Sequence, residues 1–219
     1  MVPGREIIEE LKRDYRTKRP QIVKRLTEFK QAYSKGDAVI FEELCYCILT
    51  AGSSAKMGMR TVEALRDLLQ KGTLQELQLR ARTNRVRFWR VRPSYIVQTR
   101  ECLRERCGLS LQSFIESFEN PETLRDYFAS DNGIKGLGYK EASHFLRNIG
   151  FSGYAILDKH ILNSLREMGV IGKRMRPPTT RARYLAIEKK LARFSRELGI
   201  DFNHLDLLLW SRKTGEILK

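Results

Sequence analysis

The sequence is poor in the residues that bind transition metals. Its 219 residues include only 3 histidines, which are scattered, and 4 cysteines. Cys45 and Cys47 are too close along one expected helix to bond to each other, and Cys102 and Cys107 also share an expected helix. Neither pair has the spacing of a zinc site, and no cysteine set fits an iron–sulfur cluster. We therefore expect no metal, no cofactor and four structural or incidental thiols.

Long apolar runs are also missing. The most apolar stretch, "AVIFEELCYCILTAG", carries two glutamates, whereas a membrane-spanning helix needs roughly 18 or more apolar residues. The first residues, "MVPGREIIEELKRDYR", lack the apolar segment of a secretory signal peptide. We expect an intracellular protein that does not enter a membrane.

Acidic residues are scarce relative to basic ones. Lysine and arginine total 41 against 26 aspartates and glutamates, which gives a net charge of +15 and a pI near 9.9. So large an excess of positive charge favours a polyanionic partner, either nucleic acid or an anionic membrane surface. The lack of a long apolar stretch makes the membrane the weaker choice. The segment "GKRMRPPTTRAR", residues 172–183, is the most basic irregular stretch, and it could either contact DNA or merely be solvated.

Alternation of apolar and polar residues, the pattern of β-strands, is absent, and apolar residues recur every three or four positions almost everywhere. This spacing predicts an all-α fold. Pro20 is placed to open a second helix, and Asn120 followed by Pro121 marks another helix start. We expect the later helices at about 121–130, 139–148, 159–168, 180–198 and 201–212.

The stretch "GIKGLGYKEASHFLRNIG", residues 133–150, places two glycines just before a helix. A dinucleotide-binding loop would need a preceding strand and a third glycine, but Glu141 stands at that third position. A tight connection between helices remains possible. The better interpretation is a helix-hairpin-helix, in which Gly136 and Gly138 let backbone N–H groups approach a DNA phosphate.

Lys140 lies in the first turn of the helix that follows these glycines. The positive end of the helix dipole disfavours an ammonium group there, so some free amine could act as a nucleophile; the alternative is a simple phosphate contact. Eighteen residues later, Asp158 is the expected N-cap of the next helix. Capping alone could explain this aspartate. An amine and a carboxylate beside a bound phosphate are also the groups needed for cleavage of an N-glycosidic bond.

The stretch "GLGYKEASHFLRNIG…AILDKHIL" resembles the archaeal-type 8-oxoguanine DNA glycosylase/AP lyases of the helix-hairpin-helix (HhH-GPD) DNA glycosylase superfamily, nearly residue for residue. The resemblance extends to "CYCILTAGSSAKMGMR", "VRFWRVRPSYI" and "DLLLWSRKTGEILK", and so covers most of the chain. It implies excision of 8-oxoguanine, with Lys140 as the nucleophile that forms a Schiff base and permits β-elimination, and Asp158 as the catalytic carboxylate.

The resemblance also implies a pocket for a base flipped out of the duplex. Trp210 matches a stacking tryptophan, Asp206 a base-contacting aspartate, and Lys219 a terminal lysine whose chain-end carboxylate helps to read the base. Phe88 stands where a second aromatic wall is expected. Ordinary core packing is the alternative for both aromatic residues. Gly52 replaces an asparagine of some family members, which leaves the role of that turn open.

The same resemblance implies two helical subdomains with a DNA cleft between them, one formed by residues 37–158 and the other by residues 1–36 and 159–219. We expect a monomer that acts on double-stranded DNA containing 8-oxoguanine, on the nucleoid of an archaeal or bacterial cell. Two alternatives stay open: a related glycosylase for another damaged or mispaired base, and a helix-hairpin-helix protein that binds DNA without catalysis.

Overall fold

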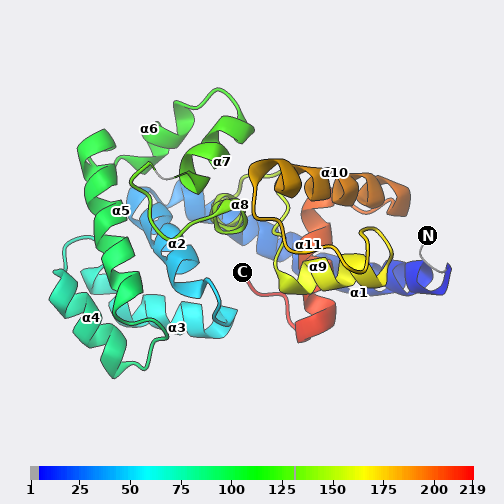
Figure 1. Ribbon diagram of the computed structural model, residues 1–219, viewed down its shortest axis with the longest axis horizontal. Coiled ribbons are helices and arrows are strands. Elements are labelled where there is room, and N and C mark those ends of the chain that lie inside the picture. The colour runs from blue at the N-terminus through cyan, green and yellow to red at the C-terminus, as the bar shows by residue number, and fades with distance from the viewer. Residues whose placement is uncertain (1–4, 131) are drawn as a thin grey trace. The chain divides into compact units, whose positions relative to one another are not determined.

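The computed structural model describes residues 5–130 and 132–219, and within these residues it contains helices and no strand (Figure 1). The all-α prediction is confirmed. The helices are α1 (Arg5–Ser34), α2 (Asp37–Thr50), α3 (Ala55–Leu65), the short 3₁₀ helix η1 (Arg66–Leu68), α4 (Leu74–Thr83), α5 (Val91–Cys107), α6 (Leu111–Glu116), α7 (Pro121–Ala129), α8 (Tyr139–Asn148), α9 (Lys159–Glu167), α10 (Arg181–Leu198) and α11 (Phe202–Thr214).

The chain divides into two compact units, one of residues 1–28 and 151–219 and the other of residues 29–150. Both junctions lie several residues before the boundaries expected from the sequence. Lys140, Phe88 and the glycine hairpin belong to the unit of residues 29–150, which we call the hairpin unit. Asp158 and α11 belong to the other, which we call the terminal unit.

Helix α1 corrects one expectation, because Pro20 lies inside it and does not open a second helix. Leu11 and Ile22 are both fully buried. They are eleven positions apart, close to three turns of about 3.6 residues, so they lie on one face of a single helix that continues past the proline. Burial on both sides of Pro20 accounts for the tolerance of a residue that removes one backbone hydrogen bond.

Helix α2 is the core of the hairpin unit and packs against α3, α5, α6 and α8. Ten of its fourteen residues are buried, among them Cys45 and Cys47. Burial raises the pKa of both thiols well above the usual value. Beyond the helix, Gly52 adopts a left-handed conformation with a φ of 65°. Asparagine also tolerates this conformation, which gives a physical reason why either residue can stand there.

In the terminal unit, α11 packs against α9 and α10. Polar contacts tie it to the first half of α1, since Lys18 Nζ donates to Ser211 Oγ at 3.0 Å and Arg212 pairs with Glu10 at 2.7 Å. No helix in the described part of the chain is long and apolar enough to cross a membrane.

Candidate active site

The hairpin between α7 and α8 is anchored to the hairpin unit by its apolar residues and by α5. The side chains of Ile134 and Leu137 are 2% and 9% exposed, and the backbone N–H of Lys135 donates to Thr99 Oγ1 at 2.9 Å. Gly136 has a φ of 80°, and a Cβ atom there would lie 2.7 Å from Cδ2 of Tyr95. Glycine is therefore required at position 136 both by conformation and by the adjacent ring.

Gly138 is different. It is the N-cap of α8, with an ordinary extended backbone (φ −108°, ψ −169°). A Cβ atom there would meet only Glu141 Oε2, at a normal contact distance of 3.6 Å. The fold itself therefore tolerates a side chain at Gly138. What glycine provides is close access to the N–H groups in the first turn of α8, where the helix dipole favours an anion.

Lys140 lies in that first turn, and its side chain is 24% exposed. Its Nζ lies 3.6 Å from Oε1 of Glu141, whose own side chain is 19% exposed. The buried thiol of Cys47 on α2 interacts electrostatically with both charges. Lys140 is thus a partly covered amine with a carboxylate beside it. It does not point into bulk water.

Asp158 caps α9, as predicted, because its Oδ1 accepts a hydrogen bond from the Ile161 N–H at 2.8 Å. Helix α10 holds the extended segment that leads to this residue. The buried hydroxyl of Tyr184 donates to the Ala155 carbonyl at 2.6 Å and accepts from the Leu157 N–H at 3.2 Å. The backbone of the segment is therefore fixed immediately before the carboxylate.

The aromatic side chain of Phe88 is 48% exposed, which excludes ordinary core packing. Its backbone has a φ of 59°, a conformation that non-glycine residues rarely adopt. Two guanidinium groups hold the ring, Arg87 at 4.7 Å and Arg92 at 4.9 Å from the ring centroid. Such strain at an exposed aromatic residue is typical of a binding site.

Helix α11 carries the other expected pocket residues. Asp206 is only 6% exposed, and its Oδ1 accepts from the Leu207 N–H at 2.8 Å. Trp210, one turn further, and Lys219 at the chain end are both partly buried. Partial burial of Trp210 is compatible with either a base-stacking or a packing role.

Sequence reasoning overlooked two residues, Glu141 and Arg92. In the sequence, Glu141 only rules out a third glycine, because adjacent positions on a helix do not normally face each other. Arg92 is 6% exposed and donates through Nη1 to the Leu49 carbonyl. Burial is the main cause that lowers its pKa, and the nearby Arg87 adds to the effect. Arg92 joins Phe88 to the end of α2. Arg87 joins it to the turn after α2, because Arg87 donates to the Gly52 carbonyl at 2.8 Å.

In the described ranges, no group of three or more histidine, cysteine, aspartate or glutamate side chains is arranged to hold a metal ion. The described site residues offer an amine, carboxylates and one exposed aromatic ring, that of Phe88, and the backbone of α8 adds a helix N-terminus.

Comparison with known proteins extends this picture. A family described as Ogg-HhH, 8-oxoguanine DNA glycosylase, matches residues 22–200. The chain is 40% identical over 200 residues to an 8-oxoguanine DNA glycosylase/AP lyase of Korarchaeum cryptofilum, with 90% of each chain covered. It is 38% identical over 198 residues to the protein of the same name from Methanocaldococcus jannaschii, covering 90% of this chain and 91% of that one.

Solved structures agree with these relatives. The crystal structure of the Methanocaldococcus jannaschii 8-oxoguanine glycosylase/lyase in complex with a 15mer DNA containing 8-oxoguanine matches with a TM-score of 0.89 and 35% identity, over 98% of this chain and all of that one. The 8-oxoguanine DNA glycosylase of Thermotoga maritima matches with a TM-score of 0.87 and 31% identity, over 98% and 99% of the two chains. The chain therefore belongs to the Ogg-HhH family of 8-oxoguanine DNA glycosylases.

Proposed function

We propose that the protein excises 8-oxoguanine from double-stranded DNA and then cleaves the abasic strand, with Lys140 as nucleophile and Asp158 as catalytic carboxylate. As a family member it is a DNA N-glycosylase with AP lyase activity. The assignment of these residues rests on one observation. The amine of Lys140, the second residue of α8, is partly covered and lies just after the hairpin glycines.

DNA binding begins with charge. The net charge of +15 supplies affinity for any duplex, and this affinity should fall steeply with salt. The first-turn N–H groups of α8, which Gly138 leaves accessible, bind a phosphate of the backbone. That contact fixes the strand next to Lys140.

Lys140 attacks C1′ of the damaged nucleotide when its amine is neutral, and it forms a Schiff base with the sugar as the base departs. Positive charge grows on the sugar in this step. The carboxylate of Asp158, oriented by its capping bond and by the fixed segment before it, stabilises that charge.

Recognition of the damaged base requires that it leave the helix stack. Phe88 offers an exposed ring for stacking, and its two arginine neighbours fix the ring in place. We assign the second stacking surface to Trp210, polar contacts to Asp206, and reading of the base edge to the chain-end carboxylate of Lys219.

Borohydride trapping on a duplex with one 8-oxoguanine tests the assignment, because reduction makes a Schiff base permanent. The wild-type protein should form a covalent adduct, and Lys140→Gln should form none. Lys159→Gln is the matched control, since Lys159 is also a first-turn lysine but is exposed; it should trap normally. An adduct that persists in Lys140→Gln would show that another amine is the nucleophile.

We also propose that the protein acts as a monomer, because one chain carries both the phosphate-binding hairpin and the proposed catalytic pair. Its substrate is chromosomal DNA, so we expect it to work on the nucleoid. A single species of about 25.5 kDa in sedimentation at working concentrations would support the monomer, and a stable dimer would contradict it.

A further inference from the structure

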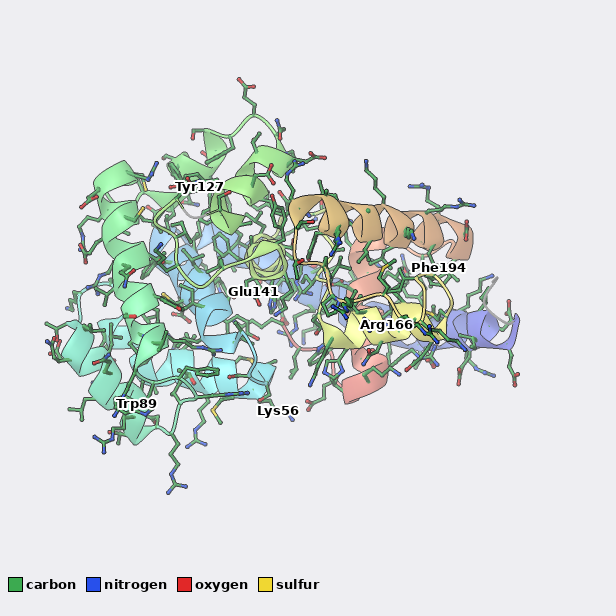
Figure 2. The ribbon with its side chains drawn as sticks, viewed as in Figure 1. Lys56, Trp89, Tyr127, Glu141, Arg166 and Phe194 are labelled. Atoms are coloured by element: carbon green, nitrogen blue, oxygen red, sulfur yellow. The ribbon has the colours of Figure 1, made fainter. Side chains whose placement is uncertain are left out.

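The carboxylate beside Lys140 has no role in the mechanism described so far. Glu141, labelled in Figure 2, follows Lys140 directly on α8, and successive residues of a helix do not normally face each other. Even so, the charged atoms of the two side chains lie 3.6 Å apart. Both side chains are mostly covered, so this ion pair differs from the freely solvated pairs on helix surfaces.

The Glu141 carboxylate lies over the first turn of α8. Its Oε2 lies 3.6 Å from the position that a Cβ atom of Gly138 would take. Arg92 of α5 and Cys47 of α2 both interact with it electrostatically. A carboxylate at this point weakens the attraction of the hairpin for a phosphate. Its presence in a basic DNA-binding protein therefore suggests that it has a function of its own.

Two further ionisable side chains, those of Cys47 and Glu43 on α2, are enclosed in the core of the hairpin unit. Cys47 is 1% exposed, and burial raises the pKa of its thiol, which therefore stays protonated at neutral pH. Glu43, 7% exposed, accepts a hydrogen bond from Asn148 Nδ2 at 3.1 Å and is enclosed in the core. Among these side chains of the hairpin unit, Glu141 is the acceptor that is both ionisable and open to the lysine amine.

We propose that Glu141 is the base of the lyase step, the group that removes a proton from C2′ of the sugar bonded to Lys140. The inference rests on the proposed Schiff base at Lys140. In the Schiff base the C=N bond is about 1.3 Å and the C1′–C2′ bond about 1.5 Å long, so C2′ lies two bonds, roughly 2.5 Å, from Nζ. A carboxylate oxygen 3.6 Å from Nζ is therefore within reach of the C2′ hydrogens.

The carboxylate of Glu141 takes the C2′ proton, the C2′–H electron pair becomes a C1′=C2′ bond, and the C=N electron pair returns to Nζ. The enamine then forms C2′=C3′ and a C=N bond again, while the C3′–O bond breaks and the 3′ phosphate leaves with its electrons. Glu141 passes its proton to water, and water later hydrolyses the Schiff base to release Lys140.

The test separates three events on one duplex carrying 8-oxoguanine: release of the base, adduct formation with borohydride, and strand cleavage without added alkali. Glu141→Gln should release the base and form the trapped adduct at close to wild-type levels. It should cleave the strand roughly 100-fold more slowly, which is the low end of the usual range for loss of a general base. Its product should be an uncleaved abasic strand that hot alkali cuts. Glu141→Asp, which keeps a carboxylate, should recover part of the cleavage rate.

Glu122→Gln is the matched control, because Glu122 is a first-turn glutamate of α7 and is exposed; it should behave as wild type. Wild-type strand cleavage by Glu141→Gln would overturn the assignment, and so would equal losses in all three events, which would place Glu141 in an earlier step or in the fold alone. Failure of the wild-type protein to form an adduct would instead refute the Schiff base at Lys140, so the two ideas fail separately.

Discussion

Substitution by alanine should affect the two hairpin glycines differently, lowering stability at Gly136 and DNA binding at Gly138. At position 136, alanine must adopt a left-handed conformation, which costs about 1–2 kcal/mol. Its Cβ would also lie 2.7 Å from the Tyr95 ring, and moving an aromatic ring in a packed site costs at least about 1 kcal/mol. Gly136→Ala should therefore lower the free energy of unfolding by about 2–3 kcal/mol.

At position 138, alanine keeps an ordinary backbone and meets one flexible side chain at normal contact distance. The change from glycine to alanine at an N-cap costs at most about 1 kcal/mol. The added methyl group, however, would stand where we propose that a phosphate approaches the first turn of α8. Gly138→Ala should thus fold almost normally and bind DNA more weakly.

Thermal unfolding and duplex binding at fixed salt measure the two effects. For a protein of this size, 1 kcal/mol shifts Tm by about 2–4 °C, so Gly136→Ala should lose roughly 4–12 °C and Gly138→Ala at most a few degrees. Binding should weaken in Gly138→Ala even at temperatures where it is fully folded. Equal losses of stability in the two variants, or unchanged binding in Gly138→Ala, would refute the division of roles.

Three further variants test the terminal unit. Asp158→Asn should keep stability and DNA binding, since asparagine caps helices as well as aspartate does, but lose most base excision; unchanged excision would reduce Asp158 to a helix cap. Tyr184→Phe removes the hydrogen bonds of the Tyr184 hydroxyl to Ala155 and Leu157 and should cost about 1–3 kcal/mol in denaturant unfolding; no cost would mean that this contact does not hold the segment before Asp158. Deletion of Lys219 should slow release of 8-oxoguanine more than cleavage of a ready-made abasic site, and equal losses would contradict its pocket role.

Local signals in the sequence located most of the fold. The starts of α7 and α9 follow from Asn120, which accepts from the Thr123 N–H at 2.9 Å, and from Asp158, because a capping side chain acts over three residues. The continuity of α1 through Pro20 could not be predicted from such local signals. A proline is a strong local signal for a boundary, and it was overridden by burial of Leu11 and Ile22 on either side.

The site was predictable where a motif specifies a residue type, and not where contacts bring residues together. Gly136, Gly138 and Lys140 follow from the hairpin pattern. The ion pair with Glu141 could not be deduced from adjacent positions on a helix. The contact of the Arg92 guanidinium with the Phe88 ring depends on where the start of α5 lies relative to the end of α2. Spacing in the sequence does not reveal that position.

The burial of the two thiols in α2 affects how well the protein resists oxidation, the same process that produces 8-oxoguanine. Cys45 and Cys47 are 0% and 1% exposed, and burial keeps both protonated. Peroxide attacks the thiolate form of exposed cysteines. A repair enzyme needed most when guanine is being oxidised therefore keeps these two thiols protonated and buried, where the same oxidants act most slowly on them.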